Sequence, residues 1–176
     1  MILSLITVSY NTKELTLQTL ETAIKEINSS SILKNQTEIF VVDNDSKDGS
    51  PKACENLLKK LKFPHYKVFA NKENLGFARA NNQATEIAKG KYIILLNSDT
   101  ITHKGGLSLL VEAMEKGGIK EETANLASSG KLDKLGIIAP TLLNPDGTIQ
   151  NQGGSLPSLK TVAAQMLFLD DIPFFG

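Results

Sequence analysis

The stretch YIILLNSDT, residues 92–100, contains the transition that decides the fold. Its apolar run, Tyr92–Leu96, is bounded by Gly90-Lys91 before it and by Asn97-Ser98 after it. A short apolar run of this kind is typical of a strand that is covered on both faces inside a parallel sheet. In open α/β sheets, ligands bind beyond the carboxyl ends of the strands. Asp99 therefore has two interpretations at this point, a functional acid or a cap of the next helix.

Strand and helix patterns alternate along the first two thirds of the chain. Strands are expected at Ile2–Val8, Glu38–Val42, Tyr66–Ala70 and Tyr92–Leu96. Each is followed by apolar residues that repeat with the 3.6-residue period of a helix, which predicts parallel βαβ units. Ser50 before Pro51 predicts the cap and the start of the second helix, and Gly90 predicts the end of the third. We expect an α/β fold, a mostly parallel sheet with helices on both faces.

The pattern changes after the fourth helix. The polar, glycine-containing segment Gly117–Lys134 predicts a mobile connection or an insertion. A fifth strand is expected at Gly136–Leu143, followed by the turn Asn144–Gly147 and a short antiparallel return at Thr148–Gln150. A short amphipathic segment, Leu159–Leu169, precedes an apolar ending that suggests a chain truncated at its C-terminus.

Charge and composition exclude several classes of partner. Lys and Arg total 19, as do Asp and Glu, so the formal net charge is zero. Nucleic acid is therefore not expected as a partner, and any anionic ligand must be held locally. The single cysteine, Cys54, excludes an internal disulfide and a multi-cysteine metal site, and it suits a reducing cytosol. No transmembrane segment is expected, because no window approaches the roughly 20 apolar residues that a spanning helix needs.

Three polar clusters fall at the predicted carboxyl ends of three strands: Thr7–Asn11, Asp43–Ser46 and Asn97–Asp99. Parallel topology would bring them to one edge of the sheet. In the segment NLGFARANN, residues 74–82, Gly76 opens a helix whose free amides suit an anion, and Arg79 would add further donors. The alternatives are a surface cation for Arg79 and a solvated helix face for Asn81 and Asn82.

The convergence of these clusters predicts a nucleotide-diphosphate site. Carboxylates at such an edge hold Mg²⁺ or Mn²⁺, which neutralises a diphosphate, and an aspartate accepts from a base imide or a ribose hydroxyl. The sequence has neither the glycine fingerprint of a Rossmann dehydrogenase nor a Walker lysine loop. A phospho-receiver domain remains a weaker alternative, since Ser9-Tyr10-Asn11 follows the first strand where receivers carry an acidic pair.

The motifs ITVSYN, VVDNDSKDGS, NLGFARANNQA, YIILLNSDT and PDGTIQNQGG resemble the amino-terminal half of a family 2 glycosyltransferase with the GT-A fold. The resemblance is closest to rhamnosyltransferase-like members and runs from Ile2 to about Pro157. It implies a GT-A domain at residues 1–157 and the start of an acceptor-side region at 158–176. It also implies inverting transfer of a sugar, rhamnose or another hexose, from a UDP- or dTDP-sugar to a glycan or lipid-linked acceptor of cell-wall polysaccharide synthesis. The implied location is the cytoplasm or the inner face of the membrane.

The resemblance assigns roles to individual residues. It implies that Ser9 and Tyr10 line the nucleoside pocket, that Asp43 bonds the pyrimidine, and that Asp99 is the ligand of Mg²⁺ or Mn²⁺. Asn97 departs from the family pattern, because many relatives have aspartate there. The expected nucleotide-sugar-binding residues are Ser9, Tyr10, Asn11, Asp43, Asn44, Gly76, Phe77, Arg79, Asn81, Asn97, Ser98 and Asp99.

The catalytic base is not identified in this sequence. Family members carry a Glu-Asp pair in a later acceptor-binding region, and its aspartate deprotonates the acceptor hydroxyl. Asp170 and Asp171 lack the flanking pattern of that pair. We therefore expect the chain alone to bind a donor without transferring the sugar, and a non-catalytic nucleotide-sugar binding module is the alternative function.

Overall fold

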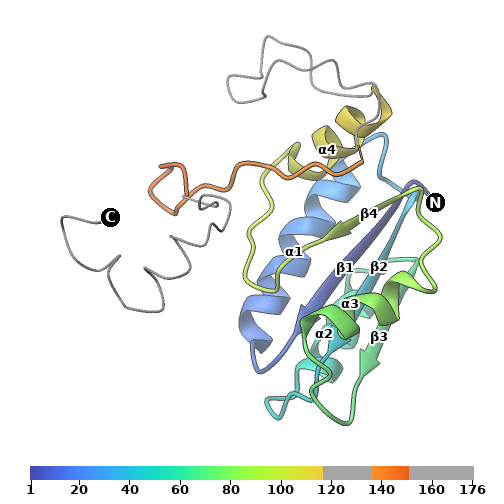
Figure 1. Cartoon of the computed structure of the whole chain (residues 1–176), viewed down its shortest axis with the longest axis vertical. Coiled ribbons are helices and arrows are strands. Elements are labelled where there is room, and N and C mark those ends of the chain that lie inside the picture. Colours follow the sequence, from blue (N-terminus) through green and yellow to red (C-terminus); the bar gives the residue numbers. More distant parts are fainter. Residues whose placement is uncertain (117–135, 151–176) are drawn as a thin grey trace, which may run out of the picture. The chain divides into compact units, whose positions relative to one another are not determined.

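The alternation of strands and helices that the sequence predicts is present in the computed structural model, which describes residues 1–116 and 136–150. The chain divides into two compact units, residues 1–139 and 140–176. The elements of the first unit are β1 (Leu3–Ser9), α1 (Lys13–Ser29), β2 (Thr37–Asp43), α2 (Ser50–Lys60), β3 (Tyr66–Ala70), α3 (Phe77–Thr85), β4 (Tyr92–Leu95) and α4 (Gly106–Glu115) (Figure 1). The predicted connection 117–134 and the predicted segment 159–169 lie outside the described residues.

The four strands form one parallel sheet in the order β3-β2-β1-β4. Ser9, the last residue of β1, lies opposite Asp43, the last residue of β2, so the carboxyl ends of these strands share one edge. The chain moves outward from β1 to β3 and then returns through α3 to β4 on the other side of β1. This reversal makes the space between the ends of β1 and β4 the topological switch point of the sheet, where ligands of open α/β folds bind.

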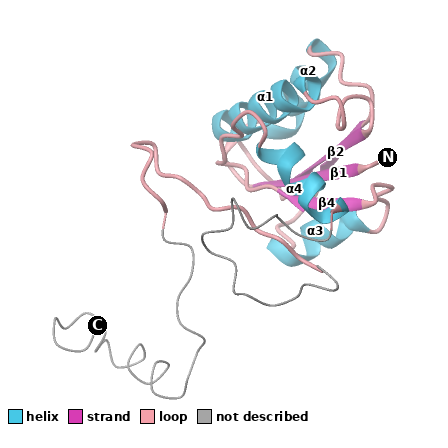
Figure 2. Ribbon diagram, turned by 90° about the horizontal axis from the view of Figure 1, so that it is seen from above, coloured by secondary structure: helices cyan, strands magenta, loops and turns pink. Residues whose placement is uncertain are grey.

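Helices cover both faces of the sheet, as predicted. Figure 2 shows α1 and α2 on one side of the strands and α3 on the other. Successive side chains of β1 serve the two faces in turn, because Leu5 packs in a core with α1, α2 and α4 whereas Ile6 packs with α3. The first core includes Cys54, whose side chain is buried.

One prediction about β4 is wrong. The apolar run at Tyr92–Leu96 predicted a strand covered on both faces, but β4 lies at one edge of the four-stranded sheet, and Ile93 and Leu95 are 42% and 53% exposed. Tyr92 and Ile94, which point to the opposite face, pack against the first core. The reason is that the apolar core beneath α3 is built on β1, β2 and β3 and includes no residue of β4.

The prediction that Gly90 ends the third helix is wrong. Helix α3 ends at Thr85, and Gly90 lies where the chain passes close to β1. Its amide donates to Ser4 Oγ at 2.8 Å, and the Ser4 hydroxyl donates to the Glu38 carboxylate at 2.6 Å. A Cβ atom at this position would lie only 2.4 Å from the backbone nitrogen of Ser4. Close packing of two backbones, rather than helix termination, therefore requires glycine here.

The start of α2 is also built differently from the expectation. The helix begins at Ser50, as predicted, but the capping position is Gly49, with a φ of 81°, and Ser50 makes no side-chain cap. The Ser50 hydroxyl instead donates to the carboxylate of Asp48. Asp48 therefore takes the place that the sequence assigned to the serine.

The predicted fifth strand at Gly136–Leu143 is wrong in the part that the structure describes. Residues 136–142 form no strand, and Ile137 is 90% exposed. The turn after it is confirmed, because the amide of Gly147 donates to the Asn144 carbonyl at 2.9 Å. The antiparallel return is reduced to a single bridge between Leu143 and Ile149. Within the described residues, no helix is both long and apolar enough to cross a bilayer.

Candidate functional site

A hollow of about 320 Å³ opens at the switch point of the sheet. The end of β1 and the segments that follow β1, β2, β3 and β4 contribute to its wall. The lining residues are Val8, Tyr10, Thr12, Asn44, Asn74, Phe77, Asn97, Ser98 and Asp99. Six of these residues were candidates from the sequence: Tyr10, Asn44, Phe77, Asn97, Ser98 and Asp99. Val8, Thr12 and Asn74 were not. The volume lies at the small end of the range for pockets that hold small molecules.

The segment after β4 presents its polar side chains to this hollow. The Thr12 hydroxyl donates to Ser98 Oγ at 3.2 Å and so joins the end of β1 to the end of β4. Asp99 is exposed, and its carboxylate has no hydrogen bond or ion pair with any described residue. Helix α4 starts only at Gly106, with Gly105 at its capping position, so Asp99 is not a helix cap. The interpretation of Asp99 as a cap of the next helix is therefore wrong.

The residues after β1 alternate between the hollow and the interior. Tyr10 is 50% exposed and lines the hollow, whereas Ser9 is fully buried and its hydroxyl lies 3.0 Å from that of Thr16. Asn11 has a positive φ of 53° and forms two hydrogen bonds with the loop that follows β2. Its amide donates to Ser46 Oγ, and its side-chain oxygen accepts from the amide of Lys47, both at 2.8 Å. Ser9 and Asn11 therefore order the loops around the hollow without lining it.

Asp43 and Asn44, at the end of β2, behave differently from each other. Asp43 is 1% exposed and does not line the hollow; one carboxylate oxygen accepts from the Ser46 amide at 2.9 Å, and the other has no partner among the described residues. A buried acceptor without a partner is costly, so this oxygen is available to a donor that can reach it. The side-chain amide of Asn44 forms hydrogen bonds through both its oxygen and its nitrogen. It accepts from the Leu75 amide at 2.9 Å and donates to Asn74 Oδ1 at 2.6 Å.

The start of α3 is held by this asparagine pair. Asn74 Oδ1 also accepts from the amide of Gly76, which occupies the capping position with a φ of 79°. Phe77 follows, 58% exposed and against the hollow. Arg79 is exposed and does not line the hollow. Asn81 is buried and donates back to the Phe77 carbonyl at 2.9 Å, so its interpretation as a solvated helix face is wrong.

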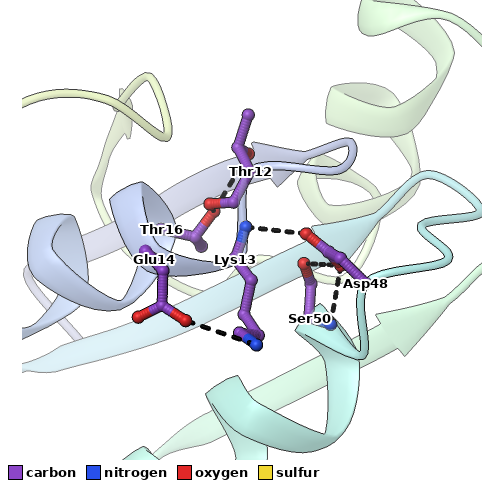
Figure 3. A network of polar contacts seen from close by, with 6 residues as sticks. All are labelled: Thr12, Lys13, Glu14, Thr16, Asp48 and Ser50. Carbon is purple, nitrogen blue, oxygen red and sulfur yellow. Dashed lines mark hydrogen bonds and ion pairs between the residues drawn. The ribbon is translucent and has the colours of Figure 1, made fainter.

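Asp48 is an organising residue that the sequence analysis missed. One of its carboxylate oxygens accepts from the amide of Lys13 at 2.8 Å, and the other accepts from the amide and the hydroxyl of Ser50 (Figure 3). Desolvation alone would raise the pKa of this carboxyl, but the hydrogen bonds from Ser50 and Lys13 hold the pKa below its ordinary value. Asp48 thus ties the first residue of α1 to the first residue of α2.

The residues at the end of β4 suit a hard cation in their chemistry. No group of three or more His, Cys, Asp or Glu side chains that could hold a metal occurs within the described ranges. Asp99 and Asn97 nevertheless offer a carboxylate and an amide oxygen at the hollow. Mg²⁺ is commonly bound by one or two carboxylates together with phosphate oxygens of a substrate, so this donor set fits such an ion only with a phosphate ligand present.

Comparison with known proteins places the chain among glycosyltransferases. Residues 4–121 match the family model described as glycosyl transferase family 2. Over 116 residues the chain is 28% identical to the dolichyl-phosphate beta-glucosyltransferase of Dictyostelium discoideum, a match that covers 65% of this chain and 36% of the relative. The chain spans about a third or less of the length of the curated relatives that it matches.

Solved structures share the fold. TarS of S. aureus in complex with UDP-GlcNAc matches with a TM-score of 0.55 and 23% identity, over 66% of this chain and 32% of that one. The mannosyltransferase PcManGT from Pyrobaculum calidifontis, solved with GDP-Man and Mn²⁺, matches with a TM-score of 0.54 and 24% identity, over 63% of this chain and 30% of that one. These likenesses show a GT-A-like α/β fold for the part that they cover.

Proposed function

This chain belongs to glycosyl transferase family 2, and we propose that the hollow at the switch point binds the nucleoside diphosphate of a sugar donor. One observation carries the proposal. Asp99, beside Asn97 and Ser98, has a carboxylate with no partner among the described residues, and it lies in the hollow that the segments after all four strands build. A free carboxylate at a switch point is placed to receive a ligand rather than to stabilise the fold.

A diphosphate needs positive charge, and the described wall of the hollow contains no Lys or Arg. We propose that Asp99 and Asn97 hold Mg²⁺ or Mn²⁺ together with the donor. When bound, such an ion neutralises the diphosphate and stabilises the nucleotide as it leaves. The presence of Mn²⁺ with GDP-Man in the mannosyltransferase of the same fold supports this assignment.

The nucleoside would lie against the aromatic side of the hollow. Tyr10 and Phe77 are large, exposed and part of its wall, and such rings bind the faces of nucleobases. The imide N–H of uracil or thymine is a donor for the unpaired oxygen of Asp43. The side chain would have to turn outward to meet it, because Asp43 does not line the hollow. We therefore propose UDP or dTDP as the carrier, and the UDP-GlcNAc complex of TarS favours UDP.

In the full reaction, we propose that an acceptor hydroxyl of a glycan or lipid-linked acceptor attacks the anomeric carbon as its bond to the diphosphate breaks. The configuration inverts, the nucleoside diphosphate leaves, and a base takes the hydroxyl proton. The sugar is a hexose, with rhamnose as the candidate from the sequence resemblance. This chain supplies the donor side, and we propose that transfer needs a longer chain, since the relatives extend well beyond the matched part.

Calorimetric titration with UDP tests the donor site. We expect the parent chain to bind UDP at least about tenfold more tightly with Mn²⁺ than with EDTA, a difference of about 1.4 kcal/mol. Asp99→Ala should lose that difference. Glu86→Ala is the matched control, because it removes an exposed carboxylate of the same unit that lies outside the hollow. Equal Mn²⁺-dependent affinity in Asp99→Ala and the parent would refute the role of Asp99, and an absence of UDP binding by the parent would overturn the function.

A further inference from the structure

Helix α1 carries a stripe of polar side chains that points into the protein. Its members are Thr12, just before the helix, followed by Thr16, Thr19, Thr22 and Glu26. Steps of three and four residues place them on one face of the helix. The polar face of a surface helix usually meets solvent. Here Thr16, Thr19 and Glu26 are all buried, with Glu26 only 4% exposed.

This stripe contacts the connection between β4 and α4 at two places and the first turn of α4 at a third. The Thr12 hydroxyl donates to Ser98 Oγ at 3.2 Å. The Thr22 hydroxyl accepts from the amide of Thr102 at 3.1 Å. Oε1 of Glu26 accepts from both the amide and the hydroxyl of Ser108, at 3.3 and 2.9 Å. The three contacts follow the order of both segments, so the connection runs along α1.

Beyond Leu96, the other hydrogen bonds within the described part of the connection are short-range backbone bonds. The pairing of β4 with β1 ends near Leu95, and α4 begins only at Gly106. The capping residue of α4 is Gly105, which has no side chain to satisfy the free amides of the first turn. Glu26 accepts from one of these amides, that of Ser108, and its negative charge also suits the amino end of α4. The segment that carries Asp99 is therefore held between β4 and this contact.

Holding the connection with a buried carboxylate carries a cost in folding free energy. The second oxygen of Glu26 has no partner among the described residues, and a buried acceptor left in that state lowers the stability of the fold. An apolar side chain of similar size would avoid that cost but would leave the amide of Ser108 without its acceptor. The arrangement therefore favours a fixed path for the connection over stability.

We propose that Thr22 and Glu26 are positioning residues, which set the place of Asp99 relative to the end of β1 and so its capacity to hold the metal with a sugar nucleotide. The proposal rests on the proposed function for its ligand. The positioning itself depends only on the path of the connection between β4 and α4. The two parts are separable, because the path can be measured without any ligand.

Hydrogen exchange of the ligand-free protein tests the path. In Glu26→Leu, which keeps the volume and removes the acceptor, we expect the amide of Ser108 to exchange at least about tenfold faster than in the parent. Glu26→Gln retains an acceptor oxygen and should restore most of the protection. Glu21→Leu is the control, since Glu21 is an exposed carboxylate on the same helix. Thr22→Val, a smaller change, should raise exchange at Thr102 alone and covers the case in which Glu26→Leu does not fold.

UDP titration then tests the consequence for the site. In Glu26→Leu the Mn²⁺-dependent gain in UDP affinity should fall below about threefold, whereas affinity in EDTA stays within about twofold of the parent. Glu26→Gln should recover the gain, and Glu21→Leu should keep it. Unchanged exchange in Glu26→Leu and Thr22→Val would overturn the proposal, as would an equal loss of affinity with and without Mn²⁺. A parent that binds no UDP would overturn the proposed function instead, while the exchange rates still decide the path.

Discussion

Replacing Gly90 by alanine would test how β4 is fixed against the centre of the sheet. The added Cβ would lie 2.4 Å from the nitrogen of Ser4 and 2.6 Å from the carbonyl carbon of Leu3, and both are backbone atoms that cannot rotate away. The chain before β4 would have to retreat. That movement would break the bond from Gly90 to Ser4 Oγ and the bond from the amide of Lys89 to the Glu38 carboxylate.

The expected cost follows from these contacts. Overpacking costs about 1–3 kcal/mol, a neutral hydrogen bond about 1 kcal/mol, and a bond to a carboxylate about 1.5–3 kcal/mol. The lower entropy of the unfolded alanine chain returns about 0.4–1 kcal/mol. We expect Gly90→Ala to lower the free energy of unfolding by about 3–6 kcal/mol.

Urea unfolding followed by circular dichroism measures this change, with Gly106→Ala as the matched control. A Cβ at Gly106 would meet only a Thr102 methyl group, at the ordinary contact distance of 3.7 Å. The control should therefore stay within about 0.5 kcal/mol of the parent. A Gly90→Ala protein within about 1 kcal/mol of the parent would refute the argument that this glycine is required by the close approach of two backbones.

Two further predictions concern the rim of the hollow. Phe77→Ala should weaken UDP binding about tenfold or more, since stacking on an aromatic ring contributes about 1–3 kcal/mol per base. The midpoint of urea unfolding should change little, because Phe77 is 58% exposed. A lower midpoint with unchanged UDP affinity would contradict the stacking role. The lowered pKa of Asp48 means that its contribution to stability is complete above the unfolded pKa, about 3.9, and is lost as the pH falls through the lower folded pKa. Asp48→Asn should therefore show a smaller loss of stability between about pH 4 and pH 2 in urea titrations, and an unchanged acid dependence would argue against it.

The order of strands and helices could be predicted because each element carries its own period in the sequence. The exposure of one face of β4 could not be predicted. An apolar run such as Tyr92–Leu96 shows that its side chains favour burial, but it does not show which helix packs on the strand. Gly90 illustrates the same limit. A glycine that ends a helix and a glycine that admits a neighbouring backbone are identical in the sequence, and only the position of Ser4 distinguishes them.

The hollow itself was predictable from the polar clusters at the strand ends, which the parallel register brings together. The alternation of side chains explains why Ser9 was misplaced: Val8 and Tyr10 face the hollow, and the residue between them points toward Thr16. Asp48 and Glu26 escaped notice for another reason. Their partners, Lys13 and Ser108, lie 35 and 82 residues away along the chain, and no local pattern contains such a pair.

The single cysteine provides a chemical probe of local unfolding in this protein. Cys54 is buried between α2 and the sheet, and desolvation together with the carboxylates of Asp43 and Asp48 raises the pKa of its thiol to about 12. The reactive thiolate is therefore nearly absent at neutral pH, and the sulfur is shielded from reagents. A thiol-directed dye should label the chain only when α2 separates from the strands. The labelling rate, measured with and without a candidate ligand, would report how much that ligand stabilises the folded state. The measurement does not require the reaction to be known.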